Sequence, residues 1–85
     1  MRYNYEIILS TFFEGALHQV IRHVAKIAPI KYKRKGSQYV IYADTRDRAE
    51  LIAHIMQQLF CDMLMYRYGI PHRFCELSIS IKEKK

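Results

Sequence analysis

Residues 31–44 have the sequence KYKRKGSQYVIYAD, which is typical of a basic β-hairpin leading into a buried strand. Gly36 stands at the turn, where a tight hairpin needs a residue that tolerates positive φ. Residues 38–43 after it are almost wholly β-branched or aromatic, the composition of a central strand. The sequence therefore predicts two short strands, 30–35 and 38–43, around Gly36.

The segment before the hairpin predicts one strand and one helix. Residues 3–10 alternate with period two, and their more apolar face is expected to meet helices. Thr11 and Glu14 have the spacing of a capping box, and the helix is expected to run to about Ala28, where Pro29 ends it. Its apolar stripe has the following members: Phe13, Leu17, Val20, Ile21, Val24 and Ala28.

The segment after the hairpin predicts a long helix and a final strand. Asp44 is the expected N-cap, and the helix is expected to end near Tyr68 because Gly69 and Pro71 follow. Its last turns are expected to overhang the sheet, since a helix of this length is longer than the strands. The predicted inward stripe contains Ile52, Ile55, Met56, Leu59, Phe60, Met63 and Tyr66. Residues 75–82 alternate cleanly, with Leu77, Ile79 and Ile81 facing inward.

The order β-α-β-β-α-β is that of the ferredoxin-like α+β sandwich. We expect a four-stranded antiparallel sheet, with strand order 4-1-3-2 and both helices on one face. The opposite face is expected to be open. Residues 1–85 are predicted to form a single domain, because a chain of 85 residues with 51% apolar residues suits one small core.

The composition constrains partners and location. The formal net charge is +6, and six of the fourteen basic residues lie between Lys31 and Arg48. A second basic cluster at the end of the chain consists of Lys82, Lys84 and Lys85. We predict no membrane span and, because no apolar leader segment follows Met1, a cytoplasmic location. Cys61 and Cys75 are expected to be free thiols, since they form no CxxC pair and are too few for a disulfide scaffold.

The basic hairpin predicts a nucleic-acid-binding module, for RNA or DNA. The residues predicted to contact nucleic acid are Lys31, Lys33, Arg34, Lys35, Tyr39, Arg46 and Arg48. Residues 35–42 also partly resemble the RNP1 octapeptide of RRM domains, with matches at Lys35, Gly36, Tyr39, Val40 and Tyr42. That resemblance implies that Tyr39 points to the open sheet face and stacks on a base. Ser37 and Gln38 depart from the motif, and we do not assign the chain to that family.

The alternative hypothesis is a homo-oligomeric protein-interaction or assembly domain without catalytic activity. Its predicted interface is the outer face of the second helix, formed by Leu51, His54, Cys61, Leu64 and Met65. The spacing of His54, Cys61 and Met65 also permits a soft-metal site, but protein packing is the favoured interpretation, and we predict no metal and no cofactor. Ile8 and Ile41 are expected on the open sheet face, a second candidate surface.

No catalytic constellation is evident in the sequence. It contains no Gly-rich phosphate loop and no GxSxG motif, and no pair of carboxylates has a spacing suited to acid–base chemistry. The segment after the first strand, residues 10–15, does not resemble the phosphate-cradling loop of acylphosphatases, which share this topology. We therefore favour a protein that is not an enzyme.

Overall fold

The computed structural model describes residues 3–84, so Lys85 of the predicted C-terminal basic cluster lies outside it. The secondary structure elements, in order, are β1 (Tyr5–Ser10), α1 (Glu14–Ile27), β2 (Lys31–Lys35), β3 (Gln38–Ala43), α2 (Arg46–Tyr68), the short 3-10 helix η1 (His72–Phe74) and β4 (Ser78–Glu83). The elements of the predicted β-α-β-β-α-β order are all present, and η1 is an addition between α2 and β4. Within residues 3–84, neither helix has the length and apolarity needed to cross a bilayer.

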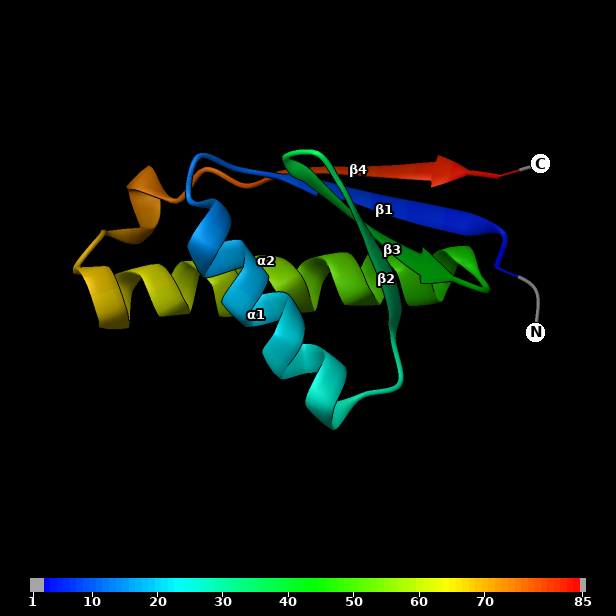
Figure 1. Cartoon of the computed structure of the whole chain (residues 1–85), viewed down its shortest axis with the longest axis horizontal. Coiled ribbons are helices and arrows are strands. Elements are labelled where there is room, and N and C mark those ends of the chain that lie inside the picture. The colour runs from blue at the N-terminus through cyan, green and yellow to red at the C-terminus, as the bar shows by residue number, and fades with distance from the viewer. Residues whose placement is uncertain (1–2, 85) are drawn as a thin grey trace.

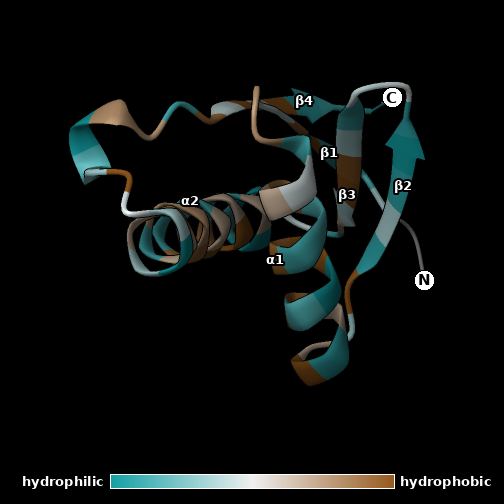
Figure 2. Cartoon of the chain, turned by 60° about the vertical axis from the view of Figure 1, so that its left-hand side comes forward, coloured by the Kyte–Doolittle hydropathy of each residue, from teal (hydrophilic) through white to brown (hydrophobic). Residues whose placement is uncertain are grey.

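The four strands form one antiparallel sheet in the order β2-β3-β1-β4, as predicted. Both helices cover the same face of this sheet, and α1 crosses the direction of α2 at a steep angle (Figures 1 and 2). β2 and β4 are the edge strands. The ferredoxin-like fold predicted from the sequence is therefore confirmed.

The core lies between the sheet and the two helices. Alternate residues of β1 and β3 face it, so that Ile7 lies opposite Ile41 and Leu9 lies opposite Tyr39. The buried residues of α1 are Ala16, Leu17, Val20, Ile21 and Val24, and all of them except Ala16 belong to the predicted stripe. Phe13 and Ala28 of that stripe are less well covered, because they flank the helix at its two ends.

The buried face of α2 is rotated from the predicted one. The residues that point into the core are Ala49, Ala53, Met56, Phe60 and Leu64. Ile55 and Tyr66, which were predicted to face inward, are 40% and 84% exposed. Small alanines at two core positions let the first half of the helix lie close to the sheet, which larger side chains there would prevent. Beyond the sheet the last turns of α2 overhang, as expected (Figure 1).

Two glycines predicted at chain turns adopt the expected conformation, whereas the two predicted N-caps are wrong. Gly36 and Gly69 have φ values of 62° and 67°, the left-handed conformation expected of them. The predicted capping box at Thr11 is wrong. The Thr11 hydroxyl accepts from the Phe13 amide and donates to the Glu76 carbonyl, so it joins two segments instead of capping α1. Thr45, one residue after the predicted Asp44, is the N-cap of α2.

Cys61 and Cys75 form a disulfide, so the prediction of free thiols is wrong. The two residues are 14 apart in sequence, but η1 turns the chain back along α2 and brings their Cα atoms to 5.6 Å. His72 Nε2 lies 3.2 Å from the Asp62 carboxylate on the same side of the helix. These contacts attach the segment before β4 to the overhanging half of α2.

Reduction of this disulfide is expected to lower the free energy of unfolding by about 2–3 kcal/mol, because a closed loop of about 15 residues restricts the unfolded chain. Urea denaturation with and without reductant measures the effect. The free energy of unfolding of the C61S/C75S double variant should not change when reductant is added. Two alkylatable thiols in the unreduced native protein would contradict the bond.

Candidate nucleic-acid interface

The open face of the sheet collects basic side chains that are far apart in the sequence. Lys31, Lys33 and Lys35 alternate along β2, and the pairing places them beside Tyr42, Val40 and Gln38 of β3. On the other edge of the sheet Lys82 lies opposite Glu6 of β1. Because side chains on one row of a sheet share a face, the register places lysines on both edges of the open face.

The centre of this face is less polar than its edges. Ile8 of β1 lies opposite Val40 of β3, and Val40 is only 3% exposed although it faces away from the helices. Lys33 flanks this pair on one side and Ser80 on the other. The β2 ribbon is hydrophilic along most of its length, whereas β3 beside it contains apolar segments (Figure 2). The open face is therefore a shallow apolar strip bordered by lysines.

Tyr42 is the aromatic residue of this strip. Its ring centroid lies 6.1 Å from that of Tyr3, and Lys84 Nζ lies 5.6 Å from the Tyr42 centroid. Lys31 Nζ lies 5.5 Å from the Tyr3 centroid. Two half-buried tyrosines with ammonium groups over them form one end of the face. Among the described strand residues on this face, Glu6 is the one acid, and it lies in the same row as Tyr42.

Tyr39 does not lie on the open face, so its predicted role in base stacking is wrong. It is 2% exposed and points toward the helices, where its hydroxyl lies 2.8 Å from His18 Nδ1. The register explains the error, because Tyr39 lies opposite the core residue Leu9 and so belongs to the inward set. Ile41, also expected on the open face, is inward for the same reason and is fully buried.

Arg34 is separated from the neighbouring lysines by the same alternation. It lies opposite Tyr39, its guanidinium carbon is 5.7 Å from the Tyr39 ring, and its Nε donates to the Gly36 carbonyl. The guanidinium thus covers the helix side of the hairpin. Of the four basic residues predicted in β2, the three lysines share the open face and Arg34 does not.

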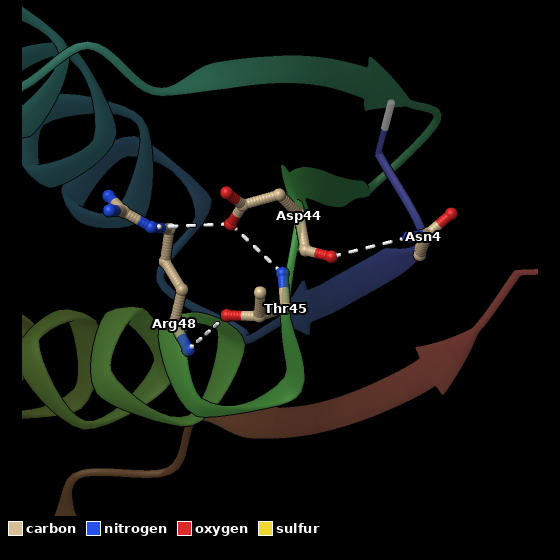
Figure 3. Close-up of polar contacts among 4 residues, drawn as sticks. All are labelled: Asn4, Asp44, Thr45 and Arg48. Atoms are coloured by element: carbon tan, nitrogen blue, oxygen red, sulfur yellow. Dashed lines mark hydrogen bonds and ion pairs between the residues drawn. The ribbon is translucent and has the colours of Figure 1, made fainter. Parts of the chain in front are cut away.

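Arg46 and Arg48 begin α2 and are each engaged by an acid one turn away. Arg46 Nε lies 3.3 Å from Glu50, and Arg48 Nε lies 3.3 Å from Asp44. The Asp44 carboxylate also accepts from the Thr45 amide, and the Thr45 hydroxyl accepts from the Arg48 amide (Figure 3). This network holds Arg48 at the start of the helix. Both arginines and Glu50 are exposed and Asp44 is only half-buried, so each pair contributes little to stability.

A hollow of about 380 Å³ brings Arg48 near the tyrosine end of the open face. Tyr3, Tyr42, Asp44 and Arg48 contribute to its lining. The hairpin turn lies at the other end of β3, about 13 Å along the strand from Tyr42. The structure therefore places Arg48 near Lys31 but far from Lys35, and does not join the α2 arginines to the hairpin turn.

The predicted interface on α2 is only partly on the surface. Leu51 is 58% exposed, Met65 is 41% exposed, and His54 is exposed. Leu64 is fully buried in the core and Cys61 is in the disulfide, so neither can serve as a free interface residue. The apolar outer face that the sequence predicted is reduced to separate exposed side chains.

Comparisons with known proteins assign no function to the chain. No protein-family model matches the chain, and no curated protein matches it. A solved structure with a similar fold is the solution NMR structure of a de novo designed protein with ferredoxin fold. It is 16% identical, with a TM-score of 0.47 over 96% of this chain and 85% of that chain.

The sequence analysis missed Tyr3, Tyr42, Lys82 and Lys84 as members of one surface. Lys82 and Lys84 were noted as a basic cluster, but their position next to β1 depends on the pairing of the first and last strands. The available signal was the alternation of β4, which places Lys82 on the polar face. Tyr42 could not be assigned, because both faces of β3 are apolar or aromatic in sequence, and Tyr3 lies before the start of β1.

Proposed function

We propose that the protein binds nucleic acid on the open face of its sheet, with the lysines contacting phosphates and Tyr42 stacking on a base. The observation that carries the proposal is the register, which gathers Lys31, Lys33 and Lys35 with Lys82 around an apolar strip. Aromatic rings within a basic surface are the usual means of binding single strands without sequence preference. The net charge of +6 has the same sign as this surface.

A single-stranded partner suits this surface better than a duplex. The strip ends in two half-buried tyrosines, and an unpaired base can lie on a ring whereas a base within a duplex cannot. Lysines on both edge strands would then neutralise the backbone on either side of the stacked bases. The cytoplasmic location stays a prediction, and the disulfide counts against it because such bonds persist mainly in oxidising compartments.

Fluorescence anisotropy with a labelled random single-stranded RNA and a DNA duplex, over a salt series, tests the proposal. Engagement of about five phosphates predicts a slope of log affinity against log salt near −3.5 for a single strand. Tighter binding of the single strand than of the duplex is expected. Absence of binding to both at low salt would refute the proposal.

Tyr42→Ala is expected to weaken single-strand binding by about 1–3 kcal/mol, the usual contribution of one base–aromatic stack. Tyr42→Phe keeps the ring and should retain the affinity. Tyr66→Ala, which removes an 84% exposed tyrosine from α2, is the control and should leave binding unchanged. Thermal unfolding of each variant separates loss of stacking from loss of the fold. Equal affinity of Tyr42→Ala and Tyr42→Phe, both folded, would exclude stacking at this position.

A further inference from the structure

The two edges of the sheet differ in how they are protected against pairing with another strand. Along β2 the edge is guarded by charge, because Lys31, Lys33, Arg34 and Lys35 are all exposed. Such rows of basic residues discourage edge-to-edge association. β4 begins with Ser78, Ile79, Ser80 and Ile81, which contain no charge. The first four residues of β4 lack the charge that protects β2 on the opposite edge of the sheet, which marks this part of β4 as suited to pairing.

Within residues 3–84, no strand pairs with β4 on the side away from β1, and half of its backbone hydrogen-bonding groups point to that side. The Lys84 amide donates to the Asn4 carbonyl at 2.6 Å, and the Glu76 carbonyl accepts from the Thr11 hydroxyl on the same side. Even-numbered residues of this segment thus direct their backbone groups toward β1. Since the direction alternates along a strand, Leu77, Ile79 and Ile81 direct theirs away from the sheet.

The side chains of these same odd-numbered residues are incompletely covered. Leu77, Ile79 and Ile81 lie on the helix side and pack against the margin of the core, but each remains partly exposed. The core of the sheet lies beneath α2 at β1 and β3, where Ile7 and Ile41 are fully buried. A further strand beside β4 would cover both the free backbone groups and these apolar side chains.

We propose that β4 and the two residues before it, Glu76 and Leu77, pair antiparallel with the same segment of a second copy of this chain, about a two-fold axis at Ile79. In this register Ile79 faces its own equivalent, and Leu77 faces Ile81 of the second copy. On the other face Ser78 faces Ser80, and Glu76 faces Lys82. The segment is therefore complementary to itself in both apolarity and charge, which selects a second copy as the occupant.

Other two-fold registers are less complementary. A two-fold axis moved one residue toward the C-terminus, to Ser80, places Leu77 opposite Glu83. An axis moved one residue the other way, to Ser78, places Glu76 opposite Ser80, so that Glu76 has no basic partner. In the register centred on Ile79, the outward backbone N–H and C=O groups of Leu77, Ile79 and Ile81 in the two copies form about six main-chain hydrogen bonds. The two sheets then form one continuous sheet of eight strands, whose open faces lie side by side.

Sedimentation equilibrium of the intact protein, from micromolar to millimolar concentration, tests the dimer through a charge-exchange cycle. Glu76→Lys places lysines opposite each other twice per dimer, and we expect it to raise the dimer Kd about tenfold. Lys82→Glu places acids opposite each other and should do the same. The double variant E76K/K82E restores opposite charges in this register and should return the Kd to within about threefold of the starting value.

Glu50→Lys is the matched control, because it makes the same change of net charge at an exposed position on α2. It should leave the Kd unchanged. Hydrogen exchange provides a second measurement, since the Ile79 and Ile81 amides should become protected as concentration rises. A protein that is monomeric throughout the range, a double variant no better than either single variant, or unprotected Ile79 and Ile81 amides in a dimer would each overturn the proposal.

Discussion

Reversal of Lys31, Lys33 and Lys35 to glutamate is expected to lower the affinity for single-stranded RNA at least about 100-fold at low salt. The three side chains alternate along β2 on the open face, so the variant replaces one basic edge with an acidic one. The magnitude of the salt slope should fall by about 2, since three phosphate contacts are lost at roughly 0.7 each. Anisotropy titrations across a salt series measure both quantities.

A control with the same change of net charge distinguishes the loss of contacts on the open face from the effect of the protein's overall charge. Arg22 and Lys26 lie on the exposed side of α1, and Arg73 lies in η1, all away from the open face. Their reversal to glutamate should change the affinity only a few-fold at 0.1 M salt, where charges are screened over about 10 Å. Equal losses from the two triple variants would mean that binding follows net charge and not the open face.

Leu64→Ala is expected to lower the free energy of unfolding by about 2–5 kcal/mol. The sequence placed Leu64 on the outer face of the second helix, whereas its side chain is fully buried in the core with Phe60. Truncation leaves a cavity where the overhanging half of α2 joins the rest of the molecule. Urea denaturation monitored by circular dichroism measures the loss, and the slope of the transition should not change.

Leu51→Ala is the matched variant, because it makes the same chemical change at a residue that is 58% exposed. Its effect on the free energy of unfolding should lie within about 0.5 kcal/mol. If the two leucines proved equally costly, or if Leu51 proved the costlier, the orientation of α2 described above would be wrong.

The strands, the turns and their order could be predicted because each has a local cause. Gly36 and Gly69 adopt positive φ where a hairpin and a helix end require it, and no other residue nearby could do so at low cost. The alternation of β1 and β4 follows from one polar and one apolar face. These signals need only neighbours in the chain, and they were sufficient for the ferredoxin-like arrangement.

The orientation of α2 and β3 could not be predicted, because both carry apolar residues on more than one side. For α2, bulky side chains suggested a face through Ile55 and Tyr66, whereas the sheet selects the face containing Ala49 and Ala53. In β3 every residue after Gln38 is apolar or aromatic, so alternation cannot identify the inward set. Only the pairing of Leu9 with Tyr39 decides it.

The amino-acid sequence by itself determined the element order, the two glycine turns and the concentration of positive charge near the hairpin. Tertiary structure decided which charges share a surface: it placed Lys82 with the β2 lysines, turned Arg34 and Tyr39 toward the helices, and joined Cys61 to Cys75. The physical reason is that strand register and helix rotation are set by packing between segments distant in sequence. A shift of one residue in either would reverse which side chains are exposed.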